Sequence, residues 1–183
     1  MDTQDQQQTP LQPAATATPS PVAAPTIDSA TIDAFIAEKR AKQSLPMAII
    51  AGLVASLIGA AAWAAVTVAA EVQIGWMAVG VGFLVGYAVR YAGKGLDPMF
   101  GYIGATFALL GCVLGNLFSV VGFVAREESV SFFDILGSLN LSGALKMLEV
   151  TFSPMDLLFY GIAIYEGYRF SFLQINAKDI PVR

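Results

Sequence analysis

The sequence lacks histidine altogether and has a single cysteine, Cys112, which lies inside an apolar run. A disulfide framework needs several cysteines, and zinc sites and acid–base catalysis usually depend on histidine. These absences exclude imidazole chemistry and a disulfide framework within the chain, and they argue against a zinc site. No pattern of residues indicates a catalytic centre, so we expect no enzyme activity, no metal site and no cofactor.

Charged residues are also scarce, at 13% of the 183 residues, whereas 56% are hydrophobic. With a mean hydropathy of +0.64, the chain is too apolar for the surface of an ordinary soluble domain. The net charge is −4, but many of the carboxylates lie near the N-terminus, so this balance does not identify a partner. We therefore predict a multi-span protein whose main partner is the lipid bilayer, and we do not expect nucleic-acid binding.

Four apolar runs predict four transmembrane helices, and hence an all-α, polytopic membrane protein. The first run has 25 residues without a charge, about 37 Å of helix against a hydrocarbon core of about 30 Å. Capping signals mark several helix starts: Asp97 precedes a proline, and Ser153 with Asp156 and Ser131 with Asp134 have the spacing of a capping box. The predicted transmembrane domain, residues 45–172, contains spans at about 46–70, 74–91, 98–125 and 154–172.

The segments outside these spans have their own signatures. Residues 1–26 are rich in Gln, Pro, Ala and Thr, which predicts a disordered tail. Residues 27–44 predict a juxtamembrane amphipathic helix at the membrane surface; a docking site for a partner is the alternative. Residues 126–153 mix apolar and charged side chains, which predicts an amphipathic outer segment, although a lid over an outer cavity would show the same pattern. Residues 173–183 form a short tail.

Glycines recur with a 7-4-7 spacing in two spans, at Gly75, Gly82, Gly86 and Gly93 and again from 104 to 122. At about 100° per residue each set falls on one helix face. Such a face lets another backbone approach closely, and we expect the two glycine faces to pack on each other. In the first span small residues recur every fourth position from Ala48 to Ala64. The predicted helix-packing residues are Gly52, Gly59, Gly75, Gly82, Gly86, Gly104, Gly111, Gly115 and Gly122.

Four polar residues form a possible intramembrane site. Asn116 is an amide within the third span, where it can hydrogen-bond to a neighbouring helix or line a solute path. Glu166 is the one acid expected within the hydrocarbon, and it needs a partner. Arg169 at i+3 and Arg90 at the end of the second span are the two candidates. A structural ion pair and a proton- or cation-handling acid are both open.

Basic residues indicate the orientation. Four spans would place the two chain ends and the connection between the second and third spans on one side of the membrane. Eight of the ten basic residues belong to this side, and only Arg126 and Lys146 belong to the other. By the positive-inside rule both termini are expected in the cytoplasm.

Two blocks of sequence are distinctive: QIGWMAVGVGFLVGYAVR with the following GKG, and FSPMDLLFYGIAIYEGYRFSF. In these blocks the chain from about Pro46 to Phe172 resembles a group of uncharacterised bacterial multi-pass membrane proteins. The resemblance implies a bacterial cytoplasmic (inner) membrane. It implies no activity and no site residues.

Two classes of function follow from these observations. The first is an integral membrane structural or interaction protein, a small scaffold or a subunit of a membrane complex. Its expected partners are other membrane proteins or a second copy, with a possible cytoplasmic partner for the N-terminal tail. The alternative is a transport or channel component that uses Asn116 and Glu166.

Overall fold

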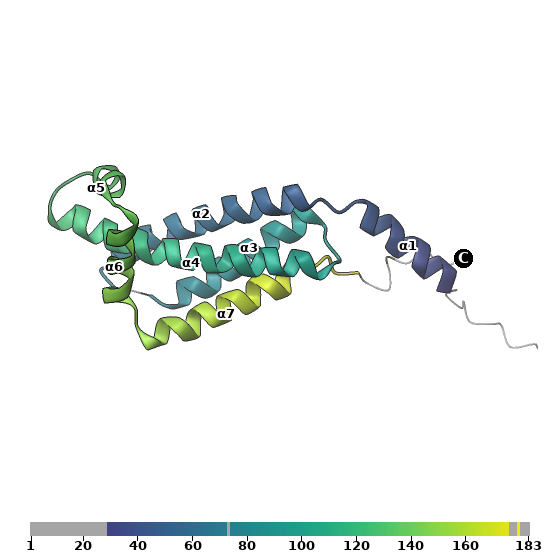
Figure 1. The fold of residues 1–183 in the computed structure, drawn as a ribbon. Coiled ribbons are helices and arrows are strands. Elements are labelled where there is room, and N and C mark those ends of the chain that lie inside the picture. Colours follow the sequence, from purple (N-terminus) through teal and green to yellow (C-terminus); the bar gives the residue numbers. More distant parts are fainter. Residues whose placement is uncertain (1–28, 73, 176–178, 180–183) are drawn as a thin grey trace, which may run out of the picture.

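The computed structural model describes residues 29–72, 74–175 and 179, and this part of the chain is helical, without strands. The predicted all-α class is therefore confirmed. The predicted disordered tail and most of the C-terminal tail lie outside the described residues. The helices are α1 (Ser29–Ala41), α2 (Leu45–Ala70), α3 (Trp76–Gly93), α4 (Pro98–Glu127), α5 (Phe132–Ser138), α6 (Leu141–Thr151) and α7 (Pro154–Phe170) (Figure 1).

Local side chains explain where several helices begin. The capping box predicted at the start of α7 is confirmed: Ser153 Oγ accepts from Met155 N at 3.3 Å, and Asp156 Oδ2 accepts from Ser153 N at 2.8 Å. At α5 only half of the predicted box forms, because Ser131 accepts from the N–H of Phe133 and the reciprocal bond is not made. These caps fix the helix starts without tertiary contacts.

Asp97 occupies the N-cap position of α4 but does not cap it. Its backbone is extended, with φ −81° and ψ 149°, and its side chain makes no capping hydrogen bond. The carboxylate instead forms an ion pair with Arg40, 3.4 Å away. Pairing across the chain has therefore replaced the local cap that the sequence predicts, and it connects the end of α1 to the start of α4.

The long helices α2, α3, α4 and α7 pack side by side as a bundle (Figure 1). Helices α3 and α4 contact each other and form its centre. Each of them also contacts α2 on one side and α7 on the other, whereas α2 and α7 do not contact each other. The central pair is thus enclosed by neighbours on two sides, which explains why small residues are needed on more than one face.

Three hydrogen bonds, two of them between backbone groups, bring distant segments together at one end of the bundle. Ser44 N donates to Gly93 O at 2.9 Å, and Leu173 N donates to Gly95 O at 2.8 Å. Leu96 N also donates to Gln43 Oε1 at 3.0 Å. The start of α2, the α3–α4 connection and the residues after α7 therefore share this end. Helix α1 projects beyond it, and α5 and α6 lie at the opposite end (Figure 1).

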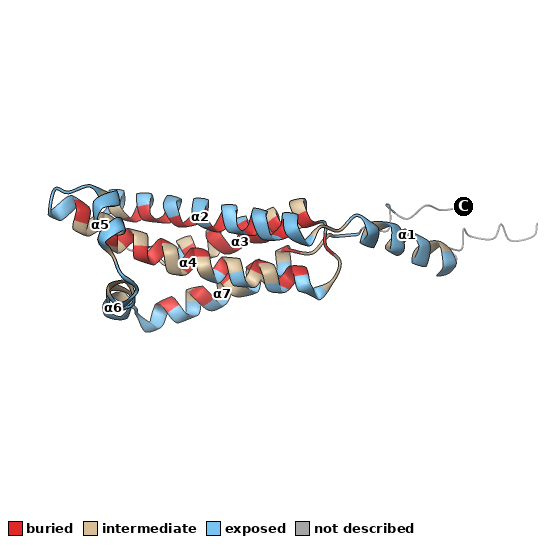
Figure 2. Ribbon diagram, turned by 45° about the horizontal axis from the view of Figure 1, so that its top comes forward, coloured by how far each residue is buried: buried red, intermediate tan, exposed pale blue. Residues whose placement is uncertain are grey.

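In each long helix one face is buried in the bundle and another is exposed (Figure 2). The predicted small-residue face of α2 is buried, from Ala48 through Ser56 to Ala64. Its outer face exposes a band of large aliphatic side chains. A soluble protein rarely shows so continuous an apolar surface, whereas lipid tails are a suitable neighbour for it. The band consists of Ile49, Ile50, Leu53, Val54, Leu57, Ile58 and Val66.

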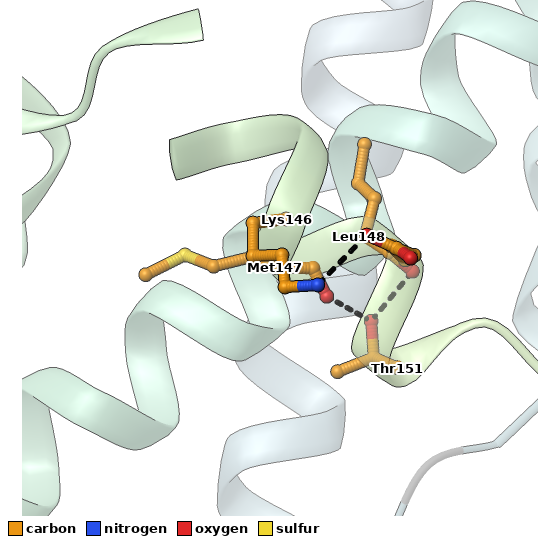
Figure 3. A network of polar contacts seen from close by, with 5 residues as sticks. Lys146, Met147, Leu148 and Thr151 are labelled. Carbon is orange, nitrogen blue, oxygen red and sulfur yellow. Dashed lines mark hydrogen bonds and ion pairs between the residues drawn. The ribbon is translucent and has the colours of Figure 1, made fainter. Parts of the chain in front are cut away.

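By length and composition, α2 and α4 are apolar enough to cross a membrane, and α6 with α7 would make a third span if counted as one. These two helices are bent by 107° at the break between them. Helix α6 ends at Thr151, whose Oγ1 donates to the carbonyl oxygens of Met147 at 2.8 Å and Leu148 at 3.4 Å (Figure 3). Helix α7 then begins anew at its own cap. Two to three helices are thus long and apolar enough to span.

Candidate functional site

Three glycines at the start of α3 and along it face α7 at very short range. A Cβ atom on Gly82 would lie 2.6 Å from the carbonyl oxygen of Ala163 and 2.8 Å from its Cα. One turn on, a Cβ on Gly86 would lie 2.9 Å from the Cβ of Phe170 and 3.2 Å from the carbonyl oxygen of Glu166. Gly75, at the start of α3, meets the ring of Phe159 in the same helix α7. At these positions there is no free volume for a side chain.

The glycines of α4 face two different helices. Gly104 lies against Ser171 Oγ and the carbonyl oxygen of Gly167, close to the end of α7. Further along α4 the same stripe meets α2. A Cβ on Gly111 would lie 3.3 Å from Ser56 Cα, and a Cβ on Gly115 would lie 2.8 Å from the Trp63 ring. A Cβ on Gly122 would lie 2.7 Å from Val68 Cγ2.

The expectation that the two glycine faces pack on each other therefore differs from the structure. Three members of the α3 stripe, Gly75, Gly82 and Gly86, face α7, whereas Gly93 meets Ala48 of α2 and Phe100 of α4; the α4 stripe is divided between α7 and α2. The nearest approach of an α4 glycine to α3 is a side-chain contact, 2.6 Å between a Cβ on Gly111 and Val81 Cγ1. Val81 is also buried, although it belongs to the side opposite the α3 glycines. A central helix has several neighbours, and its periodicity does not say which neighbour meets which face.

The glycines of α2 contact side chains of the central pair. A Cβ on Gly52 would lie 2.6 Å from the ring of Phe107 in α4. A Cβ on Gly59 would lie 3.2 Å from Val81 Cγ2 in α3. These neighbours are side chains that can move, whereas Gly82 faces backbone, so the two α2 positions are more tolerant of a methyl group than Gly82.

Asn116 is the centre of a buried polar network between α4 and α7. Its side chain is 1% exposed, and Nδ2 donates to the Tyr160 hydroxyl at 3.3 Å. The hydroxyl in turn donates to the carbonyl oxygen of Cys112 at 3.3 Å. The Cys112 thiol lies 3.9 Å from the carbonyl oxygen of Ala78 in α3. One set of polar contacts therefore joins the three helices α3, α4 and α7 inside the bundle.

The other three residues of the predicted polar site do not join this network. Glu166 is half-buried, and its Oε2 is buried without a hydrogen-bond partner among the described residues. Arg169 donates to the hydroxyl of Tyr165 at 3.1 Å, and Arg90 lies over the ring of Tyr91, 5.9 Å from its centroid. Neither arginine forms an ion pair with Glu166 in the part of the chain that the structure describes. The predicted pairing is thus not formed.

Arg126 contacts the C-terminal end of α2. Arg126 Nη1 donates to the carbonyl oxygen of Val68 at 3.1 Å, and Nη2 lies 2.8 Å from Glu71 Oε1. Glu71 is the C-cap of α2 and has a left-handed backbone with φ 56°. A cation at the carbonyl end of a helix complements the helix dipole. Arg126 therefore holds the end of α2 to the end of α4.

An apolar cavity of about 590 Å³ lies between α2, α4 and α5. Helix α5 contributes Phe132, Phe133 and Leu136, while Arg126 is its only charged lining residue. Residues 126–153 were predicted to be an amphipathic outer segment or a lid over an outer cavity, and both stay predictions. Asn116 and Glu166 are not among the described residues that line this cavity.

A second cavity, of about 390 Å³, lies at the other end of the bundle, between α1 and α3, and we call it the basic cavity. Lys42 is paired with Glu38 at 2.6 Å, and this hydrogen bond, with the positive charge of Lys42, lowers the pKa of Glu38. Lys39 lies over the ring of Phe35, 5.0 Å from its centroid. The lining residues are Lys39, Lys42, Arg90, Tyr91, Lys94 and Leu173.

Sequence reasoning missed Tyr160 and two buried polar groups on α2. Trp63 Nε1 and Thr67 Oγ1 are buried without a hydrogen-bond partner among the described residues. Tyr160 carries no local sequence signal that links it to Asn116, because their hydrogen bond depends on the register between α4 and α7. Within the residues that the structure describes, no three His, Cys, Asp or Glu side chains form a group that could hold a metal ion.

Comparisons with protein-family models, curated proteins and solved structures gave no match to this chain. The resemblance of the two sequence blocks to bacterial multi-pass proteins therefore stays a prediction.

Proposed function

We propose that this chain crosses the membrane four times and that α2, α3, α4 and α7 are its spans. Helices α2 and α4 are the two that are long and apolar enough to cross alone. Helix α3 packs against both of them, and α7 packs against α3 and α4. With 18 and 17 residues, α3 and α7 are about 27 and 26 Å long, close to the thickness of the hydrocarbon core. Helices packed alongside two spans lie at the same depth in the bilayer.

Glycine contacts are the proposed means of association. Lipid tails are as apolar as leucine, so membrane helices associate through close van der Waals packing and hydrogen bonds instead of through the hydrophobic effect. The short approaches at Gly82 and Gly104 to the backbone of α7 supply the first. The Asn116–Tyr160 hydrogen bond supplies the second.

The proposed orientation has both termini in the cytoplasm of a bacterium, with the protein in its inner membrane. Support comes from the distribution of basic side chains: Lys39, Arg40, Lys42, Arg90 and Lys94 lie near the end shared by the start of α2 and the α3–α4 connection. The positive-inside rule assigns this end to the cytoplasm.

Within this arrangement the chain is a structural or interaction subunit of a membrane complex. The observation that carries this proposal is the buried polar network of Asn116, Tyr160 and the Cys112 carbonyl, which joins helices internally. A solute path needs polar groups that face an open space, and Asn116 is 1% exposed. Of the two groups named for transport, Asn116 thus serves the packing of the bundle, and Glu166 is the one that the transport alternative keeps.

The outer faces of α2 and α7 are the surfaces on which another membrane protein or a second copy would pack. Each presents large apolar side chains outward, among them Ile58 on α2 and Leu158 on α7. The two helices lie on opposite sides of the central pair, so the bundle can contact two neighbours at once. A cytoplasmic partner for the N-terminal tail is also part of this proposal.

Site-specific photo-crosslinking in native membranes tests this function. A photoreactive residue at Ile58 or Leu158 is expected to give a discrete adduct, whereas the same residue at Val85, which is fully buried, gives none. The complementary measurement is solute flux in liposomes that contain the purified protein. A flux that Glu166→Gln abolishes, together with no adduct at either outer position, would replace the structural proposal with the transport alternative.

A further inference from the structure

The basic cavity gathers more positive charge than the surrounding carboxylates balance. Of its four cations, Lys42 has Glu38 as a partner, and no carboxylate lines the cavity. Asp97, in the connection between α3 and α4, is engaged by Arg40. Lys39, Arg90 and Lys94 form no ion pair within the described residues. Cations held around one hollow repel each other, and a bound anion would remove this repulsion.

We propose that the basic cavity binds the phosphate-bearing headgroup of an anionic phospholipid. This inference rests on the membrane placement proposed above, because that placement brings the cavity to the level of the headgroups. Arginine and lysine contribute in different ways: the planar guanidinium of Arg90 can donate two parallel hydrogen bonds to phosphate oxygens, and the lysines act as point charges.

The lining of the cavity favours a lipid over a soluble phosphate compound. Arg90 is in the last turn of α3, where the proposed span ends, and its side chain is half-buried. Tyr91 is 72% exposed next to it, and tyrosine is enriched at the membrane–water interface. Leu173 adds an apolar wall. A cavity lined by four cations together with Tyr91 and Leu173 matches an anionic lipid, and basic clusters on the cytoplasmic side attract such lipids.

Lys94 occupies a backbone position that favours glycine. It is the C-cap of α3, with φ 50° and ψ 35°, the left-handed conformation that costs least for glycine. This position is thus occupied by a lysine although its backbone conformation favours glycine, and the lysine side chain lines the basic cavity. The substitution Lys94→Gly removes the charge while it relieves the backbone, so it separates binding from folding.

Binding of a fluorescent phosphatidylglycerol to the purified full-length protein in neutral detergent tests the proposal. We expect saturable binding that is weakened about fivefold by Lys94→Gly and about thirtyfold by Lys94→Gly combined with Arg90→Gln, because each cation near an anionic lipid contributes a comparable amount. Lys146→Gln removes a lysine at the opposite end of the bundle and is the matched control, with unchanged binding expected. Phosphatidylcholine that carries the same label is expected to bind weakly.

Thermal unfolding of each variant shows whether the fold is kept, and Lys94→Gly is expected to be at least as stable as the wild type. Equal binding of phosphatidylcholine, or Lys94→Gly indistinguishable from Lys146→Gln, would overturn the proposal. Inorganic phosphate that displaces the lipid at low millimolar concentration would assign the site to a soluble ligand instead. Photo-crosslinking at Ile58 does not depend on this cavity, so failure of the lipid site and failure of the proposed function are distinguishable.

Discussion

Gly80 and Gly82 offer a matched test of the contact between α3 and α7. Both glycines lie in the same helix, and alanine adds one methyl group at either position. At Gly80 this methyl meets nothing within 4 Å, whereas at Gly82 it lies 2.6 Å from Ala163 O, 2.8 Å from its Cα and 3.1 Å from its carbonyl carbon. Ordinary contact begins at 3.4 Å, so α7 would have to move by about 0.8 Å. All three atoms are backbone and cannot rotate away.

The two substitutions should therefore change stability in opposite directions. Gly80→Ala is expected to be neutral or to stabilise by up to about 1 kcal/mol, because alanine is the better helix former. Gly82→Ala is expected to destabilise by about 1 to 3 kcal/mol through overpacking. The assay is thermal unfolding of the purified protein in mild detergent, followed by circular dichroism. If Gly82→Ala is as stable as Gly80→Ala, the close approach of α3 and α7 at this position is not present in the protein.

Three further predictions use the same unfolding assay. Asn116→Ala and Tyr160→Phe should each lower the free energy of unfolding by about 1 kcal/mol, and the double variant should lose less than the sum; additive losses would show that the two side chains do not interact. Arg126→Gln should destabilise the protein by about 1 kcal/mol because it loses a cap of α2 as well as an ion pair, whereas Lys146→Gln loses only an exposed pair and should change little. Asp156→Asn should cost about 1 kcal/mol by weakening the α7 cap, and an unchanged midpoint would contradict that role.

Local features of this fold were predictable from the sequence, because their physics is local. The Ser153 and Asp156 cap forms as its spacing predicts. The small-residue face of α2 is buried because small residues at every fourth position fall on one side of the helix. The start of α4 was predicted from Asp97, yet the side chain that should cap it is held by Arg40, a residue from a different segment. Competition between local and tertiary partners is not visible in one sequence.

The choice of neighbours in the bundle was not predictable. A repeat of glycines defines a helix face, but Gly82 faces α7 and Gly111 faces α2 and α3 for reasons of topology. The candidate polar site was predicted in part: Asn116 is buried and hydrogen-bonded between helices, as an amide in a membrane should be. Glu166 was expected to pair with an arginine and does not, because Arg169 and Arg90 lie against tyrosine rings instead.

Cysteine accessibility is the most direct test of the four-span bundle. The native thiol, Cys112, is fully buried, so single cysteines introduced at connections can be labelled against a low background. Val72, Lys94, Val130 and Gln174 follow α2, α3, α4 and α7 in turn, and each is exposed. In intact bacteria, a membrane-impermeant maleimide should label cysteines at 72 and 130, while those at 94 and 174 should react only after lysis. Labelling of positions 72 and 94 from the same side would show that α3 does not cross the membrane, and would contradict the account.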